Sequence, residues 1–254
     1  MHRAVIVFIL FTILAVPSAH AGEQGGLLVA AAASLRYSFD EKLIPMFESR
    51  NPGVKIEATY DSSGKLQAQI ENGLEADIFM SAAPKQMNYL KDKGFIDPAS
   101  IDDLLENKIV LVRPADTPGV VTGFDNVLAA GMIAVGDPAS VPAGQYAKEV
   151  FTSLGIWDDV AAKASLGTNV TEVLNWVAEG SADVGVVYAT DAATTRRVAV
   201  IASAPAGSLK SPVLYPVGML KRTNSPDLAK KFLDFLSSPE ALAVFEEYGF
   251  SANK

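Results

Sequence analysis

Three hydroxyl side chains stand where the sequence predicts that a strand gives way to a helix. Ser34 follows the apolar run Leu27–Ala33, and Ser63 follows the alternating run Val54–Tyr60. Tyr188 stands at the end of a third, largely apolar run. Such hydroxyls donate hydrogen bonds without carrying charge. The chemistry that they indicate is recognition of a ligand rich in hydrogen-bond acceptors.

Backbone N–H groups at predicted helix starts add further donors. Val141–Gly144 precedes one helix and Thr168–Val170 precedes another. We also place Ser34 at the N-cap of the helix that follows it. Helix N-termini expose unpaired N–H groups and carry a partial positive charge of roughly half an elementary charge. Several helix starts aimed at one point therefore predict an anion site that needs no Lys or Arg.

Each of these features also has an ordinary structural interpretation. Serine is a common helix cap, so Ser34 alone indicates little. Ser62-Ser63-Gly64 is compatible with a plain turn, and Tyr188 is compatible with a core aromatic residue. It is the conjunction of these features along one chain that favours binding.

The composition excludes much of the usual catalytic chemistry. The chain has no Cys, and its two His residues are His2 and His20. Both precede the expected mature N-terminus, so His-based triads, His- or Cys-ligated zinc and iron–sulfur clusters are excluded. We expect no enzymatic activity, no cofactor and no metal held directly by side chains. The formal net charge of −8 also argues against nucleic-acid binding.

The carboxylates show no pairing that singles out a catalytic dyad. Asp77, Asp137, Asp183 and Asp191 lie near the ends of predicted strands. We interpret them as caps or as ties between loops.

The N-terminus has the three regions of a secretory signal peptide. Arg3 precedes the apolar run Ala4–Val16, and Ala19-His20-Ala21 supplies small residues for cleavage. A membrane-spanning helix needs about 20 apolar residues, more than this run provides. We expect cleavage after Ala21 and export to the periplasm.

The remaining chain alternates predicted strands and helices. Amphipathic spacing predicts helices over 35–50, 66–71, 84–93, 144–154, 171–178, 226–236 and 239–248. Apolar or alternating runs predict strands over 27–33, 54–60, 76–80, 109–112, 132–135, 183–188, 198–201 and 215–220. This order predicts an α/β fold with mostly parallel sheets covered by helices, arranged as two lobes.

Several segments together make the chain resemble the molybdate-binding periplasmic proteins of bacterial ABC transporters. The most specific match is Ala134–Pro138 followed by Val141–Glu149. The other matching segments are Ala31–Leu35, Ser62–Leu66, Gln69–Gly73, Ala76–Ser81, Gly185–Ala192, Tyr215–Val217 and Phe245–Phe250. They follow the family's order over essentially the whole mature chain.

The resemblance implies a two-lobed periplasmic binding protein fold of type II, with a tetrahedral oxyanion in the cleft. It implies a signal peptide over 1–21, a first lobe over 22–107 plus 208–254 and a second lobe over 108–207. The ligand would be molybdate, and tungstate because it is nearly the same size. The partner would be the membrane permease of an ABC transporter, and we expect a monomer.

Carried over by position, the resemblance implies five ligand-binding residues: Ser34, Ser63, Ala143, Val170 and Tyr188. The serines and the tyrosine would donate through hydroxyls, and Ala143 and Val170 through backbone N–H groups. Two departures stand out. Asp61 occupies a position where relatives often have a small neutral residue, and a carboxylate there repels a dianion unless it is paired. Asn169 and Thr171 flank Val170 where relatives often carry an acid and an arginine.

Two other functions stay open on the sequence. A receptor of the same fold could take another oxyanion such as sulfate, since cleft size is not legible in the residues. An exported hydrolase of small anionic esters would need a nucleophile and a base, and Ser63 with Lys65 is the nearest pairing.

Overall fold

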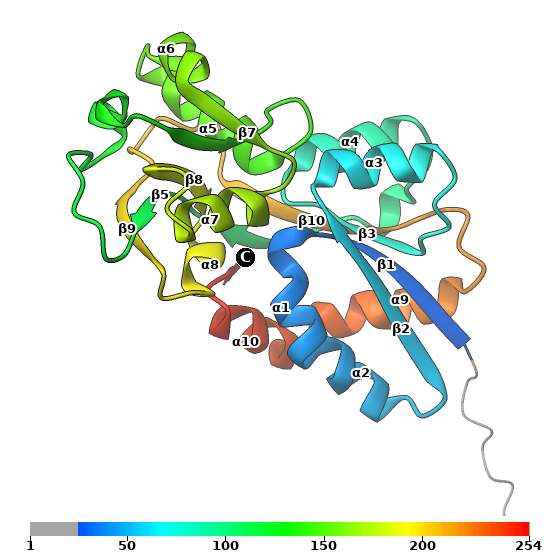
Figure 1. The fold of residues 1–254 in the computed structure, drawn as a ribbon. Helices are drawn as coiled ribbons and strands as arrows, with labels where there is room; N and C mark the ends of the chain where they lie inside the picture. The colour runs from blue at the N-terminus through cyan, green and yellow to red at the C-terminus, as the bar shows by residue number, and fades with distance from the viewer. Residues whose placement is uncertain (1–24, 254) are drawn as a thin grey trace, which may run out of the picture.

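The computed structural model describes residues 25–253, and its ribbon shows two α/β lobes (Figure 1). The predicted signal peptide lies outside the described residues. Within them, no helix combines the length and apolarity needed to cross a membrane.

Each lobe is built on one sheet. The six-stranded sheet of the first lobe has the order β11-β4-β10-β3-β1-β2, and the five-stranded sheet of the second has the order β7-β6-β8-β5-β9. The first sheet contains β1 (Gly25–Ala32), β2 (Val54–Asp61), β3 (Ile78–Met80), β4 (Asp102–Asn107), β10 (Val213–Met219) and β11 (Ser251–Ala252). The second contains β5 (Ile109–Pro114), β6 (Ile133–Gly136), β7 (Ala164–Gly167), β8 (Val184–Tyr188) and β9 (Val198–Ser203).

Helices cover the sheets. Those that follow strands of the first sheet are α1 (Arg36–Ser38), α2 (Ile44–Arg50), α3 (Ser63–Glu71), α4 (Pro84–Asp92), α9 (Pro226–Leu236) and α10 (Pro239–Glu247). Those of the second lobe are α5 (Pro142–Ser153), α6 (Trp157–Lys163), α7 (Val170–Ala178) and α8 (Ala189–Ala193). Short 3-10 turns are η1 (Ala33–Leu35), η3 (Pro98–Ser100) and η4 (Phe124–Ala129), and η2 (Phe39–Leu43) is a π-helical turn.

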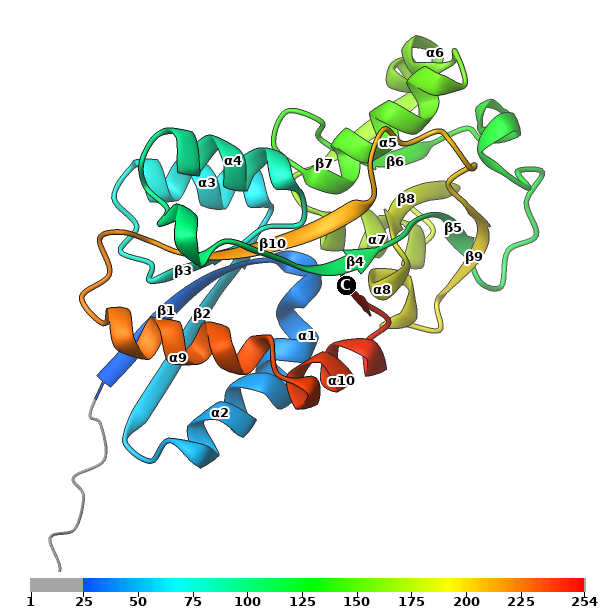
Figure 2. The same cartoon turned by 180° about the vertical axis from the view of Figure 1, so that it is seen from behind.

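The sheets are mixed, so the expectation of mostly parallel sheets is wrong in detail. β1 pairs in parallel with β2 and β3, and β6 pairs in parallel with β7 and β8. The strands that carry the chain between lobes are antiparallel to their neighbours, as β10 is to β3 and β4 and β5 is to β8 and β9. A chain that leaves one sheet for the other and later returns adds strands in the opposite direction. Figure 2 shows β4 and β10 running side by side within the sheet of the first lobe.

Besides the 3-10 turns η3 and η4, five short elements were not predicted from the sequence. These are β4, β7, β11, α6 and α8, each of two to seven residues. β4 reads Asp-Asp-Leu-Leu-Glu-Asn, a polar composition with low strand propensity, and it forms because β10 and β11 flank it. The predicted helix over 35–50 is present as a continuous run from η1 to α2, with the π-helical turn η2 inside it.

The first sheet is buried on both faces. Alternate residues of β1 point to opposite sides, so Val29 and Ala31 face one apolar cluster while Ala30 faces another with Leu66 and Phe79. On the first of these faces, aromatic rings from α2, α9 and η2 pack together. Phe232 contacts Phe47 with ring centroids 4.8 Å apart.

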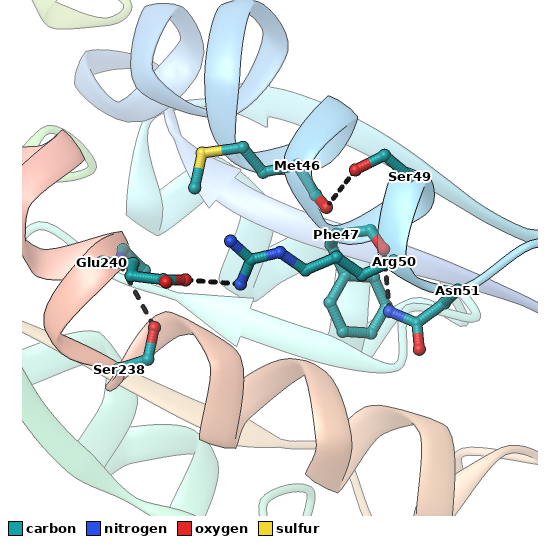
Figure 3. Close-up of polar contacts among 8 residues, drawn as sticks. Met46, Phe47, Ser49, Arg50, Asn51, Ser238 and Glu240 are labelled. Atoms are coloured by element: carbon teal, nitrogen blue, oxygen red, sulfur yellow. Dashed lines mark hydrogen bonds and ion pairs between the residues drawn. The ribbon is translucent and has the colours of Figure 1, made fainter.

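Polar contacts tie α2 to α10 at the edge of this aromatic cluster. Figure 3 shows the Arg50 guanidinium reaching the Glu240 carboxylate, while Asn51 donates to the carbonyl of Phe47 at 2.7 Å. Ser238 caps α10 by accepting from the backbone N–H of Ala241. The end of α2 and the start of α10 are thereby held together, although 190 positions separate Arg50 from Glu240.

Candidate functional site

Ser34 lies inside the 3-10 turn η1, so its expected N-cap position is wrong. The residue before the turn is Ala32, which provides no side-chain cap. The Ser34 hydroxyl is instead 3.0 Å from the hydroxyl of Tyr215. β1 runs directly into this turn, and that places the half-buried Ser34 at the carboxyl end of the strand.

Ser62 and Ser63 divide two tasks at the start of α3. Ser62 is the N-cap, and its hydroxyl accepts from the backbone N–H of Lys65. Ser63, the first helical residue, is fully buried and accepts from the backbone N–H of Ala82 at 3.0 Å. The Ser63 oxygen is engaged as an acceptor there, which leaves its hydrogen free to donate to another group.

Tyr188 ends β8 in the second lobe and reaches into the first. Its hydroxyl donates to the carbonyl of Ala82 at 3.2 Å, and its side chain is buried. Burial raises the pKa of the Tyr188 phenol well above its usual value, and the nearby Tyr215, Tyr146 and Asp191 act in the same direction. The phenol is therefore neutral and presents one hydrogen, which must turn from Ala82 to serve a ligand.

The three hydroxyls belong to one network of contacts built around Ala82 and Tyr215. Ser63 and Tyr188 meet at the two polar atoms of Ala82, and Ser34 meets Tyr215. The Tyr188 and Tyr215 rings contact each other with centroids 5.5 Å apart. Residues that closely follow β1 and β2 are thereby linked to residues of β8 and β10, so both sheets contribute to this network.

Ala143 and Val170, predicted to lie just before two helices, are inside the first turns of α5 and α7. Both are buried, and backbone N–H groups in a first helical turn have no partner inside the helix. Asn169 is the N-cap of α7 and accepts from Glu172 at 3.0 Å. Among the described residues, the hydrogen bonds that join the three hydroxyls do not extend to Ala143 or Val170.

Both lobes line an open cavity beside η1. Its volume is about 540 Å³. The first lobe contributes Ala33, Arg36 and Tyr60, and the second contributes Asn169 and Glu172. Ser34 is the neighbour of Ala33, and Val170 is the neighbour of Asn169. The cavity thus lies next to two of the predicted site residues, although it is not lined by the buried Ser63 or Tyr188.

The lobes also touch directly at α3. The backbone N–H of Gly64 donates to the carbonyl of Ser140 at 2.9 Å. A Cβ on residue 64 would lie 2.4 Å from that carbonyl oxygen, so only glycine permits this approach. The first turn of α3 therefore binds the loop that leads into α5.

The Asp61 carboxylate is paired. It accepts from the backbone N–H of Ser62 at 2.8 Å and forms an ion pair with Lys65 at 3.5 Å. The repulsion that an unpaired carboxylate would exert on an anion near Ser63 is reduced by this pairing. The same ion pair engages the side chain of Lys65, the residue that an ester hydrolase would need as its base.

The other strand-end carboxylates serve as caps or as ties between segments, which confirms the interpretation from the sequence. Asp77 accepts from the N–H of Leu28 at 2.7 Å, and Asp183 accepts from the N–H of Met132 at 2.9 Å. Asp191 is buried in α8 and accepts from the N–H of Tyr188. Burial raises the pKa of the Asp191 carboxyl to about 7, and the bond from Tyr188 opposes that shift.

Sequence reasoning missed three residues of this network. In the sequence Tyr215 stands out only as part of a segment that resembles the family, and nothing marks Ala82 or Asn107. Asn107 is buried and donates to both Thr190 and Tyr215, at 2.9 and 3.2 Å. The signal in the sequence was a tyrosine within a predicted apolar strand, because a phenol that is buried there needs a hydrogen-bond partner.

The geometry defines a two-lobed receptor whose buried donors come from both lobes, and comparison with known proteins agrees. Residues 27–251 match the family model of bacterial extracellular solute-binding proteins. The chain belongs to this family. No cluster of His, Cys, Asp or Glu in the described part of the chain has the geometry of a metal site.

Named relatives are similar over nearly their whole length. The chain is 42% identical over 226 residues to a putative ABC transporter substrate-binding lipoprotein, YvgL, of Bacillus subtilis, covering 89% of this chain and 86% of that one. It is 37% identical over 235 residues to the molybdate-binding protein ModA of Escherichia coli, covering 90% of each.

Solved structures give the same result. The substrate-binding domain of a putative molybdenum ABC transporter from Clostridium difficile superposes with a TM-score of 0.69 at 37% identity, covering 91% of this chain and all of that one. The periplasmic molybdate-binding protein of Azotobacter vinelandii gives 0.77 at 26% identity, with coverage of 90% and 100%. The two-lobed type II fold expected from the sequence is confirmed.

Proposed function

We propose that this protein is a periplasmic receptor that captures molybdate, and also tungstate, and delivers it to the permease of an ABC transporter. The observation that carries the proposal is the meeting of Ser63 and Tyr188 at Ala82. One hydroxyl comes from each lobe, both are buried, and neither is charged.

In the proposed mechanism, the anion enters between the open lobes and closure surrounds it with donors. The hydroxyls of Ser34, Ser63 and Tyr188 bind its oxygens, and the N–H groups of Ala143 and Val170 complete the set. Burying a dianion is costly unless its oxygens accept hydrogen bonds, so a site with only donors suits a fully deprotonated oxyanion. The Gly64–Ser140 contact holds the closed form, and closure creates the surface that the permease binds.

The proposed lobe limits are 22–107 plus 208–254 for the first lobe and 108–207 for the second. Sheet membership supports them, because β4 ends at Asn107, β5 begins at Ile109, β9 ends at Ser203 and β10 begins at Val213. The chain thus crosses between the sheets twice. We propose that the receptor works as a monomer and that residues 1–21 direct its export.

We propose no catalytic activity. The hydrolase alternative is disfavoured by the Lys65–Asp61 ion pair and by the Ser63 hydroxyl, whose oxygen accepts from Ala82. A sulfate receptor has the same fold, and the sulfate-binding protein SubI of Mycobacterium tuberculosis superposes with a TM-score of 0.77 at 16% identity. That likeness concerns the fold alone.

A thermal-shift series tests the proposal. Purified mature protein is heated with sodium molybdate, tungstate, sulfate or phosphate at equal concentrations. Binding to the native state raises the unfolding midpoint. At a ligand concentration one hundred times Kd, binding adds about 2.7 kcal/mol to the free energy of unfolding. We expect molybdate and tungstate to raise the midpoint and sulfate and phosphate to leave it near that of the free protein. A midpoint raised by sulfate alone favours the sulfate receptor, and no response to molybdate refutes the proposal.

A further inference from the structure

The hydrogen bonds around Asn107 have a fixed direction. The Asn107 Oδ1 atom accepts from the backbone N–H of Lys108 at 2.8 Å, and a backbone N–H can only donate. This bond fixes the orientation of the amide, so the Nδ2 group carries the two hydrogens on the other side. Those hydrogens go to Thr190 Oγ1 at 2.9 Å and to the Tyr215 hydroxyl at 3.2 Å. Both hydrogens of this buried amide and one acceptor position of its oxygen are thereby used.

The direction set at Asn107 continues through Tyr215. Because the Tyr215 oxygen accepts from Asn107, its own hydrogen is available to donate. The Ser34 Oγ atom lies 3.0 Å away, a distance at which it can accept that hydrogen. Tyr215 is fully buried, between the ring of Phe250 at 5.2 Å and that of Tyr188 at 5.5 Å, so besides Ser34 the acceptor near its hydroxyl is that of Tyr188.

We propose that Asn107 and Tyr215 are positioning residues that fill the acceptor side of the Ser34 hydroxyl and so aim its single hydrogen at the bound anion. The proposal deepens the proposed function and rests on it. A serine hydroxyl rotates freely and both donates and accepts. With Tyr215 donating to it, the Ser34 oxygen is oriented before the ligand arrives, and its hydrogen need not be withdrawn from another bond.

The position of Asn107 extends this role to both lobes. Asn107 ends β4 at the crossing from the first sheet to the second, and its two donated bonds reach Tyr215 of β10 and Thr190 of α8. The amide therefore connects one lobe to the other at the crossing. In the proposal, the same residue therefore both joins the two lobes and orients the Ser34 hydroxyl through Tyr215.

A double-mutant cycle tests the proposal, with the Kd for sodium molybdate measured by calorimetry. Ser34→Ala removes the donor and Tyr215→Phe removes only the hydroxyl that orients it. We expect Tyr215→Phe to weaken binding about tenfold in the wild-type background, the size of a partial loss of one bond to a charged group. In the Ser34→Ala background we expect less than about a twofold change, because the residue through which Tyr215 acts is absent.

Several outcomes would overturn the proposed chain of hydrogen bonds from Asn107 through Tyr215 to Ser34, called the relay below. If Tyr215 instead donated to Tyr188, Ser34 would have to donate to Tyr215, and Tyr215→Phe would leave binding unchanged or strengthen it. Equal losses in both backgrounds would mean that Tyr215 acts structurally and not through Ser34. Either result overturns the relay alone when wild-type protein binds molybdate. Wild-type protein that does not bind molybdate overturns the proposed function and the relay together.

Two further variants provide an independent test and a control. Asn107→Ala removes the donor to Tyr215 by a different substitution and is expected to show the same dependence on Ser34, so the test does not rest on the folding of one variant. Tyr89→Phe is the matched control, since its hydroxyl bonds to Glu71 on the exterior of the first lobe. We expect Tyr89→Phe to bind like the wild type in both backgrounds.

Discussion

The contact between Gly64 and Ser140 predicts a variant that loses affinity without losing stability. In Gly64→Ala, the added Cβ would lie 2.4 Å from the Ser140 oxygen, 2.7 Å from its Cα and 2.9 Å from its carbonyl carbon. All three are backbone atoms, so relief requires the loop before α5 to move away by about 1 Å, to the usual contact distance. That shift also lengthens the 2.9 Å hydrogen bond between the lobes.

The magnitude follows from these two losses. A lost backbone hydrogen bond costs about 0.5–1.5 kcal/mol and an overpacked contact about 1–3 kcal/mol, so we expect the closed form to lose about 2 kcal/mol. Because the apparent Kd rises as the closed fraction falls, molybdate binding should weaken about thirtyfold. Alanine in place of glycine inside a helix gains up to about 1 kcal/mol, so the ligand-free open form should be no less stable.

Calorimetric titration with molybdate and a thermal melt of the ligand-free protein measure the two effects. Gly119→Ala is the control, because its nearest neighbouring atom would lie 3.9 Å from the new Cβ. We expect the control to match the wild type in both measurements. Wild-type affinity in Gly64→Ala refutes the assignment of this contact to the closed, ligand-binding form.

Three further predictions concern binding, pH and the core. Ser63→Ala should weaken molybdate binding by about 1.5–3 kcal/mol in calorimetry, because it removes a donor to a charged ligand, and an unchanged Kd would exclude Ser63 from the site. For Asp191, the folded pKa of about 7 exceeds the reference value of 3.8, so the native state binds this proton more tightly and stability is lost as pH rises through 7. In urea unfolding, the free energy of unfolding of Asp191→Asn relative to the wild type should therefore rise between pH 4 and pH 8, by at most about 4 kcal/mol. A difference that does not depend on pH would contradict this role of the Asp191 carboxyl. Phe232→Ala should lower the free energy of unfolding by about 3–5 kcal/mol, since the ring is buried against Phe39 and Phe47, and a loss below about 1 kcal/mol would show that the cluster collapses around the gap.

The helices and central strands could be predicted from the sequence because their signals are local. The helix over 226–236 matches α9 at both ends, since Pro226 begins it and an amphipathic pattern continues to Leu236. Strand β4 could not be predicted in this way. Its polar residues form a strand only because β10 and β11 supply partners from much later in the chain.

Those positions of the candidate site that carry a local signal could be predicted from the sequence. Ser63 and Val170 stand just before predicted helix starts, and in the structure each is the first residue of its helix, because α3 and α7 begin earlier than predicted. Ser34 was assigned to a cap, but the chain makes a 3-10 turn there and the hydroxyl bonds to Tyr215, 181 positions away. A partner at that separation leaves no trace in local periodicity.

The sequence by itself determined the types of group available: hydroxyls and helix N-termini in an acidic chain whose only His residues are His2 and His20 and which has no Cys. Tertiary structure decided which of those groups meet. Ser63 and Tyr188 share Ala82, and Ser34 shares Tyr215 with Asn107, because the folded chain brings together segments that lie far apart in the sequence. Residue type fixes whether a group can donate a hydrogen, whereas the direction of that hydrogen depends on neighbours that only the folded chain supplies.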